Sequence, residues 1–343
     1  MKRIKTLKHS LLPALAVVLM LMPPLGSRAM VIGFISGDIN MDGEVGISDV
    51  TSLINYLLKG PGSGNEIAEG WLLTDVNKVG TVAIDDVTTL ISYLLTGEPE
   101  LPVYDGPPVP PEAEVFTVNG ISFAMVPVEG GTFMMGYNTP ENCRPVHEVT
   151  LSDFSIGQTE VTQELWLAVM GNNPSLWWHF TLLQPVDYVS WDDCQEFIAR
   201  LNELTGREFH LPSEAQWEFA ARGGNLSHGY RYAGSDDYLE VSWNYYNRLI
   251  SNIELLNPVG LLKPNELGLY DMSGNVIEYC QDGYMPYTDE PQTDPVVDVM
   301  ESYNSWRKVV IRGGAVTGNW PVTNRGKIEH GREERCYGLR LAL

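Results

Sequence analysis

The first residues with a clear chemical pattern are oxygen donors in GDINMDGEVGISD, residues 37–49. Acidic and amide side chains stand at alternate positions, a glycine permits a sharp turn, and carboxylates occupy the seventh and twelfth positions of the loop. The donors are Asp38, Asn40, Asp42, Glu44 and Asp49. Calcium takes about six to eight oxygen ligands around one point, and this spacing can supply them. The segment predicts a calcium loop; a turn that binds nothing is the alternative.

The pattern returns 37 residues later, since residues 37–60 and 74–97 are identical at 14 of 24 positions. Asp75, Asn77 and Asp86 repeat the calcium donors, but Val79 stands where the third side-chain ligand belongs. We therefore expect the second loop to bind calcium more weakly or to stay empty. Each copy runs into an amphipathic helix that ends at a glycine, so residues 30–97 predict a small α-helical module.

The N-terminus and the overall charge indicate where this protein works. Residues 1–29 join a basic start, a short apolar run and small residues at a cleavage position, which is typical of a signal peptide. Removing their five basic residues changes the formal net charge from −22 to −22 − 5 = −27. Such a surface disfavours nucleic acid as a partner. We expect a secreted, periplasmic or cell-surface protein without a membrane span; an uncleaved anchor is the alternative.

Residues 98–114 carry six prolines and predict a stiff spacer between two domains. The remainder, 115–343, predicts an α+β domain with few regular elements. Three helices are expected where Thr162, Ser190 and Ser213 can act as N-caps. Short strands are expected in FAMVPVEGGTFMMG, VIEYC and YGLRLAL.

The four cysteines, Cys143, Cys194, Cys280 and Cys336, form no CxxC motif. Since an oxidising compartment permits disulfides, the sequence leaves open either buried free thiols or one structural disulfide. Cys194 shares a helical face with Phe197 and Leu201, which indicates a core position.

Different parts of the chain resemble two known families. The paired loop–helix repeats, which start with GDINMDG and TDVNKVG, resemble dockerins, so a cohesin-like module or a surface scaffold is an expected partner. Further along, the domain resembles formylglycine-generating enzymes, also called sulfatase-modifying factors. The blocks that carry this resemblance are MVPVEGGTFMMG, VHEVTLSDFSIGQTEVTQELW, PVDYVSWDDCQEFIARLN, FHLPSEAQWEFAARGG, NELGLYDMSGNVIEY, VVIRGGA and YGLRL. It implies a C-type-lectin-like fold for residues 115–343.

The second resemblance also implies metal chemistry. It maps a calcium site onto LYDMSGNVIEY, with the side chains of Asp271 and Glu278 and the carbonyls of Gly274 and Val276; a turn that only pins two strands is the alternative. Active relatives hold copper(I) with two cysteines and oxidise a substrate cysteine to formylglycine. The matching positions here are Gly318 and Thr323, which offer copper(I) no sulfur. We therefore expect calcium but not copper, and we assign no catalytic residue.

The last 32 residues, 312–343, are basic in an acidic chain, with five Arg and one Lys against three Glu. Trp and Arg are enriched where proteins bind partners. We expect a face for a protein or glycan ligand, and an inert solvated loop is the alternative. The residues of this face are Asn319, Trp320, Asn324, Arg325, Arg332 and Arg335. The resemblance makes Arg312 and Arg340 internal ion-pair partners instead.

These observations favour an exported, dockerin-bearing binding protein that lacks oxidase activity. One alternative is an active formylglycine-generating oxidase, or a related redox enzyme, with a rearranged site. Another alternative is a variable lectin-fold receptor of a diversity-generating retroelement, because the chain departs most from the enzyme pattern just before its GLRL end.

Overall fold

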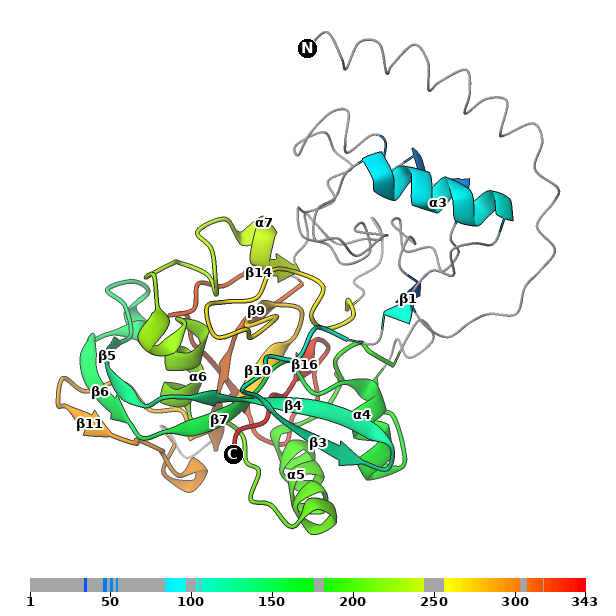
Figure 1. The fold of residues 1–343 in the computed structure, drawn as a ribbon. Coiled ribbons are helices and arrows are strands. Elements are labelled where there is room, and N and C mark those ends of the chain that lie inside the picture. Colours follow the sequence, from blue (N-terminus) through cyan, green and yellow to red (C-terminus); the bar gives the residue numbers. More distant parts are fainter. Residues whose placement is uncertain are drawn as a thin grey trace, which may run out of the picture. The chain divides into compact units, whose positions relative to one another are not determined.

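The computed structural model forms two compact units, residues 1–105 and 106–343 (Figure 1). The residues that it describes are 34–35, 46–47, 50–51, 54, 84–96, 103–104, 106–175, 182–243, 256–302, 307–316 and 318–343.

The first unit contains the helix expected after the second acidic loop, α3 (Ile84–Thr96), with Val87 and Leu90 buried. It also contains an antiparallel pair of short strands, β1 (Phe34–Ile35) and β2 (Val103–Tyr104), so the segment predicted as a spacer is paired at one point. Of the calcium donors predicted in this unit, Asp86 lies at the start of α3. The others lie outside the described residues: Asp38, Asn40, Asp42, Glu44, Asp49, Asp75 and Asn77.

The second unit is built from short strands in several small sheets. One sheet has the order β3-β4-β7, one β11-β6-β5, and one β15-β12-β10-β16, while β13 pairs with β14 and β8 with β9. The strands are β3 (Glu114–Val118), β4 (Ile121–Val128), β5 (Gly131–Met135), β6 (His147–Leu151), β7 (Phe154–Gly157), β8 (Ser242–Trp243), β9 (Ser273–Gly274), β10 (Ile277–Gly283), β11 (Gln292–Thr293), β12 (Lys308–Arg312), β13 (Gly314–Ala315), β14 (Gly318–Asn319), β15 (Gly326–Glu329) and β16 (Tyr337–Gly338).

The helices of the second unit begin where the sequence predicts caps. The structure confirms Thr162 as the N-cap of α4 and confirms capping boxes at Ser190 and Ser213 for α5 and α6. The cysteine predicted to be buried on α5, Cys194, is buried as expected. The helices are α4 (Gln163–Met170), α5 (Trp191–Thr205), α6 (Glu214–Ala221) and α7 (Tyr238–Val241), with short 3₁₀ turns at Glu141–Cys143, Gly224–Leu226 and Val299–Glu301.

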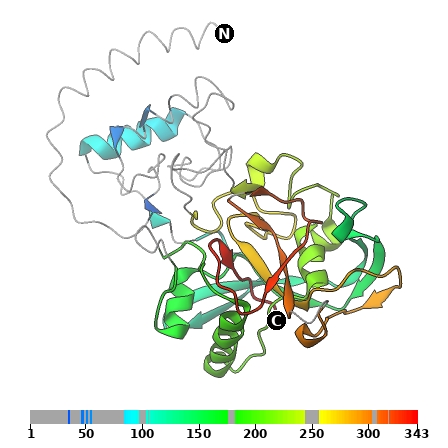
Figure 2. The ribbon, with the colours of Figure 1, turned by 180° about the vertical axis from the view of Figure 1, so that it is seen from behind.

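The chain's last residues close the domain. YGLRLAL forms a regular strand only at β16, and the residues after it bond to β7: Ser155 donates to the carbonyl of Leu343, and Gly157 to that of Leu341, each at 2.8 Å. The final segment, red in Figures 1 and 2, is therefore tied into the interior. This placement carries Arg340 to the centre of the unit, where its side chain is fully buried.

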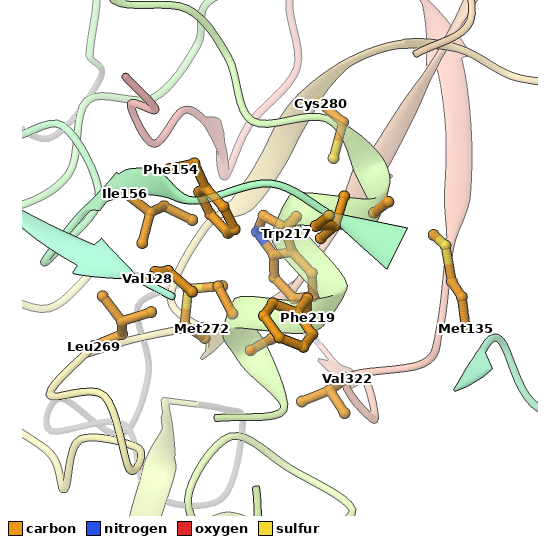
Figure 3. Close-up of a cluster of buried hydrophobic side chains, with 14 of the residues drawn as sticks. Val128, Met135, Phe154, Ile156, Trp217, Phe219, Leu269, Met272, Cys280 and Val322 are labelled. Carbon is orange, nitrogen blue, oxygen red and sulfur yellow. The ribbon is translucent and has the colours of Figure 1, made fainter. Parts of the chain in front are cut away.

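The core of the second unit surrounds α6. Trp217 and Phe219 of this helix lie among apolar side chains from β4, β7 and the 269–272 segment, as Figure 3 shows. Ala220 and Ala221 are buried as well, so α6 is enclosed on nearly all sides. A helix buried this way carries its polar residues into the interior too, and α6 carries Glu214 and Glu218.

Candidate functional site

Two arginines from the C-terminal segment enter the core to meet the carboxylates of α6. Arg312 Nε lies 3.0 Å from Glu214 Oε1, and Arg312 Nη2 lies 2.5 Å from Glu218 Oε2. Arg325 Nη2 lies 2.5 Å from Glu214 Oε2, and its Nε lies 2.7 Å from Glu214 Oε1. Two buried guanidinium groups thus pair with two buried carboxylates, and the partly exposed Arg222 is a further partner of Glu218. The predicted internal pairing of Arg312 is confirmed.

Buried charges are stable only when they are paired, and the ionisation of this network reflects that. Burial alone would raise the pKa of Glu218, but the charges of Arg312 and Arg222 lower it below the usual glutamate value. Burial works against the charge of Arg325, yet Glu214 and Tyr287 raise the pKa of that guanidinium. Glu218, Arg312 and Arg325 are therefore charged at neutral pH, and their contacts join β12 and the 320–325 segment to α6.

Arg325 is a correction to the predicted ligand face. Its side chain is buried, paired with Glu214, and stacked with its Cζ 4.0 Å from the ring centroid of Tyr287. In this position the guanidinium of Arg325 is held inside the domain and cannot contact a ligand at the surface. The sequence did show a signal for its partners, because Glu214 and Glu218 are one helical turn apart in an otherwise apolar helix.

The other residues predicted for this face differ in exposure. Trp320 and Asn324 are half-buried, and the Asn324 carbonyl accepts a hydrogen bond from Arg312 Nη1 at 3.0 Å. Arg332 and Arg335 are exposed. Strand β15 lies between these two pairs in the sequence. The side chain of Asn319 lies outside the described part of the chain.

A second buried network occupies the predicted calcium site of the second unit. Arg340 Nη2 lies 2.7 Å from Glu278 Oε1, and the indole Nε1 of Trp217 donates to Glu278 Oε2 at 2.7 Å. The internal pairing of Arg340 is confirmed. Glu278 is here an ion-pair partner, so a calcium site with Asp271, Gly274 and Val276 has lost one of its two carboxylates. Calcium at this position stays a prediction.

Glu160, which the sequence analysis missed, lies in the same network. Its carboxylate accepts hydrogen bonds from the Val276 backbone at 2.9 Å and from Asn275 Nδ2 at 2.8 Å. Burial, and after it the charges of Asp271 and Glu278, raise the pKa of Glu160 well above the usual value. Burial also raises the pKa of Asp271 to about 6. One arginine therefore faces three buried carboxylates, which favours the protonated form of Glu160.

The four thiols lie buried in different segments of the second unit. None of the four cysteines forms a disulfide, so the structure agrees with buried thiols rather than with one structural disulfide. Burial raises the pKa of Cys143, Cys194 and Cys280, so these thiols stay protonated at neutral pH. Copper(I) is bound by thiolates. Within the described ranges, no group of three or more His, Cys, Asp or Glu residues has the geometry of a metal site.

Two domain families match the chain. Residues 36–95 match the dockerin type I domain, and residues 112–343 match the sulfatase-modifying factor enzyme 1-like domain. Among the described residues, no helix is long and apolar enough to cross a membrane.

Individual proteins are similar as well. Chaperone protein LppX of Paenibacillus barcinonensis is 32% identical over 241 residues, which is 57% of this chain and 79% of that protein. Formylglycine-generating enzyme of Streptomyces coelicolor is 31% identical over 156 residues, 42% of this chain and 46% of that enzyme. Inactive C-alpha-formylglycine-generating enzyme 2 of Mus musculus is 28% identical over 221 residues, 48% of this chain and 70% of that protein.

Among solved structures, Treponema denticola variable protein 1 superimposes with a TM-score of 0.59 at 28% sequence identity. The superposition covers 68% of this chain and 99% of the Treponema chain.

Proposed function

Because the chain belongs to the sulfatase-modifying factor enzyme 1-like family and carries a dockerin type I domain, we propose that it is an exported, tethered ligand-binding protein without oxidase activity. Its second unit has the α+β, C-type-lectin-like fold of that family, as the sequence indicated. Dockerin domains generally bind calcium and dock onto cohesin scaffolds, and proteins that bear them are typically extracellular. The dockerin domain is therefore the tether in this proposal.

One observation is the main support for the proposed loss of oxidase activity. The positions that correspond to the copper cysteines are Gly318 and Thr323, and neither side chain contains sulfur. Cys143, Cys194 and Cys280 are held as buried, protonated thiols in separate elements, and Cys336 is also buried. The similarity to a protein named as inactive supports the proposal. The similarity to a formylglycine-generating enzyme means that family membership alone does not determine whether this chain has oxidase activity.

The test is direct measurement of formylglycine. The purified chain without residues 1–29 is incubated with copper, oxygen and a cysteine-containing sulfatase peptide, and the peptide is followed by mass spectrometry. We expect no conversion above a protein-free control, whereas a known active relative converts the peptide in parallel. Turnover by this chain would overturn the proposal, and its loss in Cys336→Ser would identify the thiol responsible.

The similarity to a variable protein favours a second candidate, a lectin-fold receptor whose surface is diversified by a retroelement. The exposed Arg332 and Arg335 lie just before the GLRL end and are suited to vary without disturbing the core. A neighbouring reverse transcriptase gene with a near-copy of the 312–343 coding segment supports this candidate. A genome that lacks both elements excludes it.

A further inference from the structure

A groove lies between α4, α5 and the loops beside them. It has a volume of about 610 Å³, and its walls include Trp166 of α4, Tyr188, and Glu196 and Arg200 of α5. Glu333 reaches it from the segment between the exposed Arg332 and Arg335, so the groove adjoins the exposed end of the predicted ligand face. Binding sites for small ligands have volumes of roughly 300 to 1,000 Å³.

Tyr188 has an unusual backbone at this groove. Its φ is +61°, a left-handed conformation that costs a bulky residue about 1 to 2 kcal/mol. Two distant residues fix the backbone on either side of it. Asp187 donates its backbone N–H to Ser175 Oγ at 3.0 Å, and the Val189 carbonyl accepts from the Tyr279 hydroxyl at 3.1 Å. The result is an aromatic side chain that lies at the groove and remains 37% exposed. Strain of this kind gathers at functional sites.

Trp166 supplies a second, fixed aromatic ring. It stacks on Phe197 with ring centroids 4.9 Å apart and an interplanar angle of 3°, and it is only 2% exposed. Its indole Nε1 finds no hydrogen-bond acceptor in the described part of the chain. A buried donor without an acceptor is rare in a folded protein, because it loses its bond to water and gains none.

The polar residues of the groove restrict the ligand's chemistry. Asp193, Glu196 and Glu333 carry three negative charges against the one positive charge of Arg200, so an anionic ligand is repelled. A purely cationic group only donates hydrogen bonds, so it offers no acceptor to the amide of Asn172 or to the N–H groups of Arg200 that Glu196 does not bind. The walls are helices and loops, which offer no strand edge to an extended peptide.

We infer that this groove, with Tyr188 as its aromatic platform, binds a neutral carbohydrate. A sugar ring has an apolar face that packs on an aromatic ring, and hydroxyls that both donate and accept hydrogen bonds. Those hydroxyls accept from Arg200 and Asn172 and donate to Glu196 and Glu333. The inference rests on the proposed function, since it names the ligand class of the binding protein and one site for it.

The experiment is calorimetric titration of the chain without residues 1–29 with cellohexaose, xylohexaose and mannohexaose. We expect at least one of these to bind, and Tyr188→Ala to weaken its Kd at least tenfold. Tyr188→Phe keeps the ring and should stay within about threefold of the wild type. Tyr137→Ala is the matched control, because Tyr137 is 55% exposed and lies outside the groove. Glu333→Ala, at an exposed position, should weaken binding without any change at the strained backbone.

Other results overturn the inference. It is wrong if none of the three sugars binds, if Tyr188→Ala and Glu333→Ala both bind as the wild type does, or if only a hexagalacturonate or a peptide binds. Circular dichroism melting curves show whether each variant is folded. The formylglycine assay separates this outcome from the failure of the proposed function, since a chain without turnover that also binds no sugar contradicts only the inference about the groove.

Discussion

At the scale of single residues, Glu218 and Glu196 offer a comparison within one chain. Each pairs with an arginine four positions later in its helix, Arg222 and Arg200 respectively. The side chain of Glu218 is fully buried and also holds Arg312, whereas that of Glu196 is 54% exposed. Removing one partner of a buried pair leaves an uncompensated charge in the interior. When one partner of an exposed pair is removed, water solvates the charge that remains.

We therefore expect Glu218→Gln to lower the free energy of unfolding by about 3 kcal/mol. The matched variant Glu196→Gln should change it by less than about 0.5 kcal/mol. Urea unfolding followed by tryptophan fluorescence measures both values. Equal losses in the two variants would show that burial does not decide the value of these pairs.

Asp282 predicts how stability depends on pH. Burial, and second the charge of Glu214, raise the pKa of Asp282 to about 7, although two backbone N–H groups donate to it. In the unfolded chain the pKa is about 3.9. The folded state therefore binds more protons between about pH 4 and pH 7, and the contribution of this group to stability falls as pH rises through that window. The loss is on the order of 4 kcal/mol at most.

The measurement compares the unfolding free energy of the wild type and of Asp282→Asn across that range. Asparagine stays neutral, so the variant should lack this fall while it keeps the slopes that other groups cause. Parallel curves for the two proteins would mean that Asp282 is ionised in the folded state throughout.

At the scale of elements, two glycines with a left-handed backbone allow the cost of backbone strain to be measured apart from the cost of a steric clash. Gly171 ends α4 with φ +79°, and a Cβ there meets no atom within 4 Å. Gly234 has φ +91°, and a Cβ there lies 2.7 Å from the Pro264 carbonyl oxygen. We expect Gly171→Ala to lower the unfolding free energy by about 1 kcal/mol, from strain alone. Gly234→Ala should cost about 3 kcal/mol, because backbone atoms must also move. Similar melting curves for both variants would contradict this reasoning.

The elements also show how far the sequence could lead. The N-caps of α4, α5 and α6 were predictable, because a cap needs only residues within one turn. The partners of Arg325 were not, since its ion pair with Glu214 joins positions 111 residues apart and depends on how α6 is buried. Tyr188 was equally hidden, because its left-handed backbone is imposed by Ser175 and Tyr279 rather than by its neighbours in sequence.

At the scale of the whole molecule, the chain combines two compact units with different sources of stability. The second unit has a core around α6 and buried ion pairs. The dockerin type I domain of the first unit spans only residues 36–95, and so small a domain can gain stability from a bound metal. In the proposed function, calcium therefore stabilises the tether.

The last prediction concerns the Val79 position in the second calcium loop. We expect the dockerin domain of the wild-type chain to bind one calcium ion tightly, through the loop that begins at Asp38, and a second ion weakly or not at all. Val79→Asp restores a carboxylate at the third ligand position and should tighten the second site at least tenfold, because calcium affinity rises with the number of charged oxygen donors. Isothermal titration with calcium after chelation measures both sites, and Asp38→Ala assigns the first. If Val79→Asp and the wild type titrate identically, the second loop lacks the calcium geometry for a reason other than this one side chain.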